Sequence, residues 1–199
     1  MPNPNEIKKT MLMKKLNIPQ DVISELGFHI PGYKPGHENF EMFVKMNDML
    51  TTEQKCAVME RQGCHKTGMY DKASKEWGEK HNSKTIVEKL EIMSSEGNHF
   101  MPVLNEDGTL SMTIGCYDGD NFDSISHGCH CLNGDMFNAF VEKYPDKVFS
   151  FRQMWCGCCL GHQKHHLQNK LGIKLRLKSV DVRDKMQKCV YIYEVTAQK

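Results

Sequence analysis

The segment MWCGCCLGHQKHH, residues 154–166, concentrates the side chains that can bind a soft metal ion or act as nucleophile and base. It contains Cys156, Cys158, Cys159, His162, His165 and His166. The sequence predicts a strand that ends near Trp155 and a helix over 159–170, which puts the cysteines at the helix start. Unpaired backbone N–H groups and the positive end of the helix dipole favour a thiolate there. We interpret the cysteines as metal ligands or reactive thiols rather than as core residues alone.

The histidines of this segment have a simpler interpretation. The predicted helix carries an apolar stripe made of Leu160, Leu167 and Leu171. At about 100° per residue, the three histidines fall opposite that stripe. We therefore expect them to face solvent, although a role for His162 in a metal or catalytic site stays open.

A second cysteine pair lies upstream in SHGCHC, residues 126–131. It is predicted to lie in a loop before a helix that ends ahead of Pro145. Two such pairs can supply four thiolates to one tetrahedral ion. The predicted metal ligands are Cys129, Cys131, Cys156 and Cys158, with Cys64, Cys159 and His162 as further candidates. Zinc is the expected ion, and another thiophilic metal or an Fe–S cluster is the alternative.

The same residues also allow an enzyme. Cys158 can act as the nucleophile of a small-molecule hydrolase if a base lies within hydrogen-bond reach, and His130 or His162 can be that base. A metal-bound water is a second possible nucleophile. A closed site with four protein ligands would be structural, whereas three ligands and a water would be catalytic. A thiol redox protein is the third alternative.

Composition narrows the class of protein. The chain has 199 residues and a formal net charge of +1, so it lacks the excess of Lys and Arg that nucleic-acid binding requires. No segment has the roughly 18 apolar residues of a membrane span, and no secretory signal is evident. We expect a cytoplasmic protein with a small-molecule ligand, and leave a homodimer open. Its nine cysteines are therefore not a disulfide framework.

The first half of the sequence predicts helices. Residues 38–49 have apolar side chains at helical spacing. A second helix should begin at Thr51, because Gln54 completes a capping box, and should run to Gly63. Residues 83–97 repeat this pattern, with Ser83 as the expected N-cap and Gly97 as the end.

The second half predicts strands. Residues 100–104 and 109–115 flank the turn sequence NEDG and should form a hairpin. Three more strand candidates are KVFSFRQMW (147–155), IKLRLKSV (173–180) and CVYIYEV (189–195). The expected fold class is α+β, with a helical part over 1–97 packed on an antiparallel sheet formed mainly by 98–199, in one domain. Three cysteines fit this core: Cys56, Cys116 and Cys189.

The C-terminal stretch, residues 156–195, resembles the 4-vinyl reductase-like domains and the L-2-amino-thiazoline-4-carboxylic acid hydrolase-like bacterial proteins. The positions that carry the resemblance are Cys156, Cys158, Gly161, Leu171, Gly172, Cys189 and Tyr191. The resemblance implies an α+β domain that binds a small molecule and whose cysteines hold a metal. If the chain is an enzyme, we expect hydrolysis of a C–N bond in a small non-peptide compound.

Overall fold

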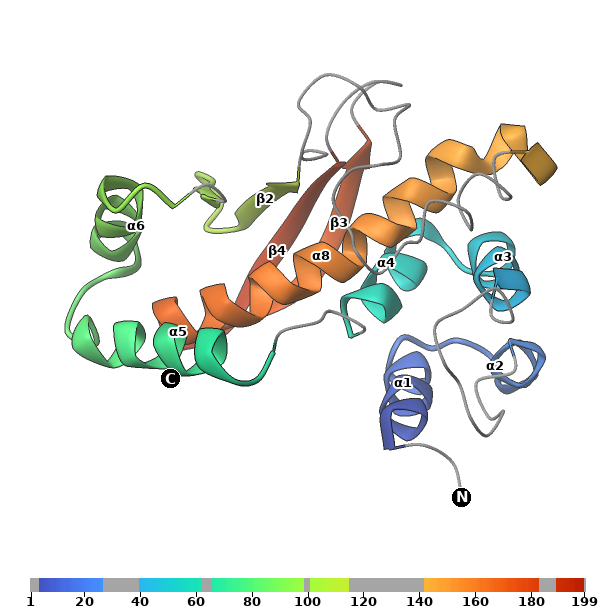
Figure 1. The fold of residues 1–199 in the computed structure, drawn as a ribbon, viewed down its shortest axis with the longest axis horizontal. Coiled ribbons are helices and arrows are strands. Elements are labelled where there is room, and N and C mark those ends of the chain that lie inside the picture. The colour runs from blue at the N-terminus through green and yellow to red at the C-terminus, as the bar shows by residue number, and fades with distance from the viewer. Residues whose placement is uncertain are drawn as a thin grey trace.

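The fold is α+β, as expected (Figure 1). A computed structural model of the chain describes residues 4–26, 40–61, 66–98, 101–114, 142–182 and 189–198. The helices that precede the sheet are α1 (Pro4–Lys15), α2 (Gln20–Glu25), α3 (Phe40–Met49), α4 (Thr52–Glu60), α5 (Met69–Lys80) and α6 (Ile86–Ser95). None of the described helices is long and apolar enough to cross a membrane.

Four antiparallel strands form one sheet in the order β1-β2-β4-β3. The strands are β1 (Val103–Leu104), β2 (Leu110–Ile114), β3 (Ile173–Val182) and β4 (Cys189–Gln198). The predicted hairpin is confirmed by the pairing of β1 with β2. β4 lies between β2 and β3, and its Tyr193 is paired with Leu110 on one side and Leu177 on the other. Alternation of apolar and polar residues therefore predicted β2, β3 and β4 correctly.

A long helix, α8 (Val148–Leu171), follows the short 3₁₀-helix η2 (Pro145–Lys147) and crosses the sheet. The prediction of a strand over 147–155 is therefore wrong. Valine, phenylalanine and tryptophan favour strands because they fit a pleated surface. Here Met154 and Cys158, one helical turn apart, are both fully buried. Packing of that helical face outweighs the intrinsic preference of the segment.

Capping residues fix two helix starts. Thr51 accepts a hydrogen bond from the Gln54 N–H at 3.2 Å and donates its own N–H to the Gln54 side chain at 3.1 Å, which confirms the predicted capping box. The N-cap of α6 is Thr85 rather than Ser83, because Glu88 stands three residues after Thr85 and completes a second box. Gly97, at φ 72°, follows the end of α6 as predicted.

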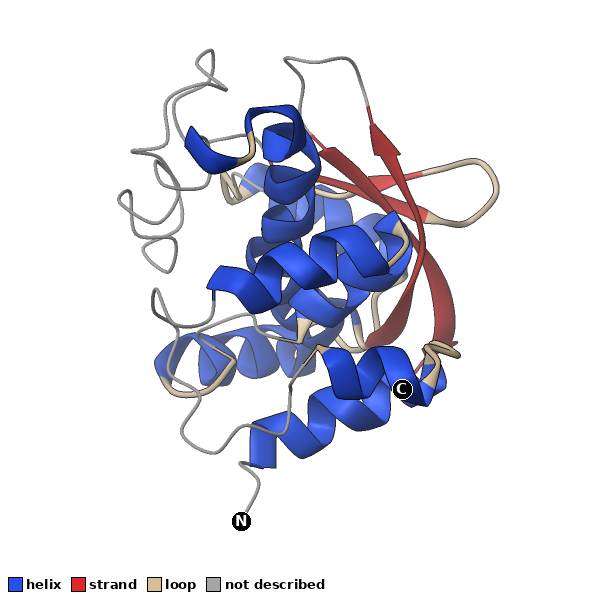
Figure 2. Cartoon of the chain, turned by 90° about the vertical axis from the view of Figure 1, so that its right-hand side faces the viewer, coloured by secondary structure: helices blue, strands red, loops and turns tan. Residues whose placement is uncertain are grey.

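The buried side chains form two clusters that share α8. The N-terminal core joins α1, α2, α3 and α4 to Met154 and Cys158 at the beginning of α8. The sheet core joins Leu160, Leu167 and Leu171 of α8 to the inner face of the sheet. The described helices gather on that one face of the sheet (Figure 2). The segment 154–166 thus lies at the centre of the fold.

Candidate functional site

The cysteines of the CGCC segment lie inside α8 and not at its start. Cys158 is 1% exposed and belongs to the N-terminal core, whereas Cys159 is half-buried against the sheet core. Because α8 begins at Val148, the backbone N–H groups around these cysteines are those of a helix interior. The expected stabilisation of a thiolate by a helix start therefore does not apply.

Most of the predicted metal ligands fall where the structure gives no description. Cys64, Cys129, His130 and Cys131 lie outside the described residues, as does Cys116, and the side chain of Cys156 is not described either. Within the described part of the chain, no group of three or more His, Cys, Asp or Glu side chains is arranged to hold a metal ion. The zinc site thus stays a prediction. Cys56, expected in the core, is fully buried.

Two glycines on α8 bring the backbones of α4 and α8 into close approach. A Cβ atom on Gly161 would lie 2.0 Å from the Glu60 carbonyl oxygen, and one on Gly157 would lie 2.8 Å from the Cys56 carbonyl oxygen. Both distances are shorter than van der Waals contact. This crossing places Cys158 beside the C-terminal end of α4.

A buried carboxylate marks that end of α4. Glu60 is 6% exposed, and its side chain accepts a hydrogen bond from the Tyr193 hydroxyl at 2.5 Å and pairs with the Lys164 Nζ at 2.7 Å. Burial and the Glu60 carboxylate raise the pKa of Tyr193 well above its ordinary value, so the phenol stays protonated as a donor. Lys164 thus compensates the charge of the buried Glu60 carboxylate, and the Tyr193 hydroxyl has an acceptor for its hydrogen bond.

Lys66 completes the surroundings of Glu60 and Cys158. Its Nζ donates to the Glu60 backbone carbonyl at 2.5 Å. Burial, followed by the neighbouring charge of Arg61, lowers the pKa of Lys66 to about 8, while Cys158 and Glu60 oppose that shift. The Lys66 ammonium is therefore a positive charge near Glu60 and Cys158.

The three histidines were predicted to face solvent, but in the structure they are only partly exposed. The leucine stripe is buried, so the predicted helix phase is correct, but α5 packs over the opposite side. His165 Nε2 lies 2.7 Å from an Asp71 oxygen, and His166 Nδ1 lies 3.1 Å from the Ser74 hydroxyl. Gly78 of α5 permits this docking, because a Cβ atom there would lie 2.2 Å from the Asn169 carbonyl oxygen. All three histidines are half-buried.

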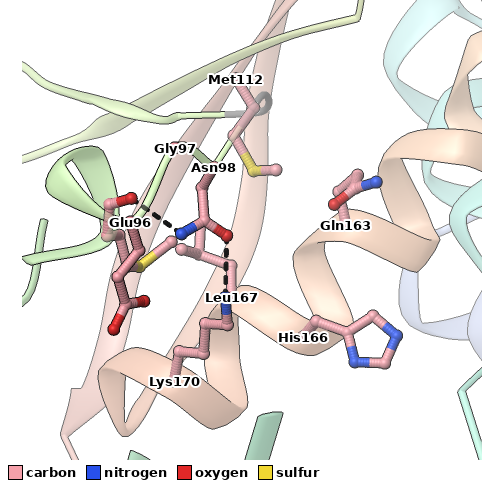
Figure 3. Close-up of a pocket in the computed structure, with 9 residues that line it drawn as sticks. Glu96, Gly97, Asn98, Met112, Gln163, His166, Leu167 and Lys170 are labelled. Carbon is pink, nitrogen blue, oxygen red and sulfur yellow. Dashed lines mark hydrogen bonds between the residues drawn. The ribbon is translucent and has the colours of Figure 1, made fainter. Parts of the chain in front are cut away.

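A pocket of about 270 Å³ lies where α6 ends, between β2 and α8 (Figure 3). It is lined by Met93, Glu96, Gly97, Asn98, Met112, Gln163, His166, Leu167 and Lys170. Three of these, Gln163, His166 and Lys170, recur on one face of α8 at i, i+3 and i+7. Cys159, four residues before Gln163, lies on that face as well.

One cation is fixed in the pocket wall. Lys170 donates from Nζ to the Asn98 side-chain oxygen at 3.0 Å, and Nζ lies 5.6 Å from the centre of the Trp77 ring. Asn98 is itself held, because its side-chain nitrogen donates to the Met93 carbonyl at 2.8 Å. Burial lowers the pKa of Lys170, and the Glu96 carboxylate partly opposes this. The pocket therefore contains an ammonium group of reduced basicity in a defined position.

This pocket was not predicted from the sequence, although the segment 154–166 and the residues that follow it carry part of its signal. The spacing of Gln163, His166 and Lys170 could have been recognised as one polar face. The contributions of Asn98 and Met112 could not, because they depend on where α6 and β2 pack.

Comparison with known proteins adds no relative to this description. A scan against protein-family models finds no match, and neither the curated proteins nor the solved structures contain a match to the chain. The resemblance of residues 156–195 to the 4-vinyl reductase-like and amino-thiazoline-carboxylic acid hydrolase-like families stays a prediction.

Proposed function

We propose that the chain is a small-molecule-binding domain whose ligand occupies the pocket between α6, β2 and α8. The observation that carries the proposal is that Lys170, Asn98, Gln163 and His166 line one cavity of about 270 Å³ in which Asn98 holds the Lys170 ammonium. Small-molecule sites combine an apolar lining with a few fixed polar groups in this way. The volume suits a compact metabolite rather than a large cofactor.

The arrangement of the lining supports a ligand with an oxygen function at one end. Figure 3 places Lys170 and Asn98 together on one side of the pocket, and Gln163 on the other. Met93 and Met112 supply apolar surface between helix and sheet. A carbonyl or carboxylate oxygen would meet the ammonium, and the rest of the molecule would contact the methionines.

The predicted hydrolase with Cys158 as nucleophile is a second candidate. The positive charge of Lys66 near Cys158 is the observation that favours it. However, Cys158 lies in the N-terminal core, and helix spacing turns it away from Gln163, His166 and Lys170 by roughly 80–140°. Binding in the pocket is therefore the better-supported function, and zinc held by the cysteines is a separate expectation.

The proposal is tested by filling the pocket. We would record ligand-observed saturation-transfer NMR of pyruvate, acetate and acetone with the full chain and with Gln163→Trp. The indole should occupy the cavity, so the variant should lose the signal of whichever probe binds. Lys80→Trp, an exposed change at the end of α5, is the matched control and should keep it.

Two results would overturn the proposal. One is that none of the three probes binds the unmodified chain at millimolar concentration. The other is that Gln163→Trp, folded by circular dichroism, binds them as the unmodified chain does. Where a probe binds the unmodified chain, Cys158→Ser should retain that binding, and loss of binding in that variant alone would favour the thiol site.

A further inference from the structure

We propose that the Lys170 amine is a nucleophile that forms an imine with small aldehydes or ketones in the α6–β2–α8 pocket. This inference rests on the proposed function, because the carbonyl compound must first occupy the pocket. It goes further in assigning a covalent step and a chemical class of ligand to one residue.

The position of Nζ supports the proposal. The Asn98 side-chain oxygen and the Trp77 ring hold Nζ at 3.0 Å and 5.6 Å, respectively, so the long side chain is already ordered. Both Asn98 and Lys170 line the cavity. A carbonyl carbon placed in the pocket would meet an oriented amine, which reduces the entropic cost of the bimolecular step.

The environment also favours the reactive form of the amine. Only the neutral amine has a lone pair for attack, and burial shifts the pKa of Lys170 downwards, which increases the neutral fraction at neutral pH. The titratable groups around the pocket are Glu96 at the end of α6 and His166 on α8. The Glu96 carboxylate stabilises the ammonium and therefore restrains the reactivity.

The step balances without an added oxidant or reductant. The nitrogen lone pair forms a C–N bond to the carbonyl carbon, and the carbonyl π electrons move to oxygen, which takes up a proton. The first N–H proton balances the proton taken up by oxygen; the hydroxyl of the resulting carbinolamine then takes a proton from solvent and leaves as water, and the remaining N–H proton of the iminium returns to solvent. The products are one imine and one water per amine and carbonyl consumed.

Two other lysines provide a comparison. Lys89 is 5% exposed, but its Nζ donates to the Leu171 carbonyl at 3.0 Å at the end of α8. Lys174 lies exposed on β3. Lys89 is thus a buried lysine, and Lys174 an exposed lysine, that both lie outside the α6–β2–α8 pocket.

The test uses pyruvate with sodium cyanoborohydride, which reduces an imine to a stable secondary amine. Peptide mass mapping of the full chain at limiting pyruvate should place the first adduct on Lys170. Lys170→Arg keeps the positive charge and should lose that adduct completely. Lys174→Met, the matched control, should leave the labelling of Lys170 unchanged.

A pH profile separates reactivity from accessibility. Glu96→Gln removes the carboxylate that stabilises the ammonium, so the half-maximal rate of Lys170 labelling should move to lower pH. Two results would contradict the imine. One is that the most exposed lysines are labelled first, and the other is that Glu96→Gln leaves the pH profile of Lys170 labelling unchanged.

The two proposals fail in different ways. If pyruvate binds by saturation-transfer NMR, and Gln163→Trp abolishes that binding while no Lys170 adduct forms, the imine is wrong and the binding pocket stands. If pyruvate, acetate and acetone all fail to bind, the binding proposal fails first and the imine falls with it. Circular dichroism of each variant shows that the chain is folded.

Discussion

At the scale of single residues, Gly161 and Gly157 determine how closely α8 approaches α4. Each faces a backbone carbonyl of α4 at a distance that no Cβ atom tolerates. This contact positions the Glu60 carboxylate so that it interacts with Tyr193 and Lys164. A side chain at Gly161 would therefore disturb both the helix crossing and the buried carboxylate network.

We expect Gly161→Ala to destabilise the protein by about 2 kcal/mol or more. Alanine improves helix propensity by about 1 kcal/mol, but the new methyl group would lie 2.0 Å from the Glu60 carbonyl oxygen, so backbone must move. Chemical denaturation measures the difference. Gly157→Ala, with its nearest contact at 2.8 Å, should cost less, and the reverse order would show that the crossing is not as described.

The predicted metal site can be tested by metal analysis and by substitution of Cys158. Protein purified without added metal should contain close to one equivalent of a thiophilic ion by elemental analysis, since paired thiolates require a cation between them. Cys158→Ser should lower both metal content and melting temperature, and acidification should release the ion. Cys56→Ser, a buried change outside the predicted ligands, is the control. A metal-free and fully stable protein would contradict the site.

At the scale of elements, the docking of α5 on α8 is mostly polar. Asp71 accepts hydrogen bonds from Lys75, His165 and Asn169, and Ser74 contacts His166 and Asn169. Hydrogen bonds from Lys75 first, and then from His165, lower the pKa of Asp71 to about 2. The ionised carboxylate is therefore the form that holds α5 in place.

Acid should loosen α5 before the rest of the fold. The depressed pKa of Asp71 means that its contribution is complete above the unfolded value of 3.8 and is lost as pH falls towards about 2. The protection of the α5 amides against hydrogen exchange, relative to an unfolded chain at the same pH, should fall over that range. Asp71→Asn should show low protection already at neutral pH and little further loss on acidification. Glu76→Gln, an exposed acid on the same helix, should behave as the unmodified chain does.

Elements with a strong local signal were predictable from sequence. Alternating residues identified β3 and β4, and the Thr51–Gln54 pair identified the start of α4, because these signals depend on neighbours in the chain. The beginning of α8 was not predictable, since its strand-favouring residues are held in a helix by tertiary contacts. Tertiary contacts also place α5 against His165 and His166 and bring Asn98 into the pocket. Neither arrangement was predictable from neighbours in the chain.

At the scale of the whole molecule, α8 joins two cores. Its first half contributes Met154 and Cys158 to the N-terminal core, and its second half contributes Leu160 and Leu167 to the sheet core. A single helix of 24 residues cannot lose one half without weakening the other. We therefore predict that the two cores unfold together.

Met154→Ala and Leu167→Ala test this coupling. Each removes a buried side chain from a different core and should destabilise by about 2–5 kcal/mol. Both variants should show one thermal transition at lower temperature, with coincident curves from far-UV circular dichroism and tryptophan fluorescence. Two separate transitions, each moved by only one of the variants, would show that the cores are independent.

Among the strands that the structure describes, the ten-residue strand β3 is an edge of the sheet, and this position has a consequence for association between molecules. A long, regular edge offers its unpaired N–H and C=O groups to the strand of another chain. Register shifts between Lys174 and Leu175 and between Leu177 and Ser179 interrupt the regularity of β3. The exposed side chains of Lys174, Arg176 and Lys178 also lie along this edge, the last two paired with Glu194 and Asp107, and charged side chains on an edge strand disfavour pairing with another strand. We therefore expect this irregular, charged edge to disfavour strand pairing between molecules.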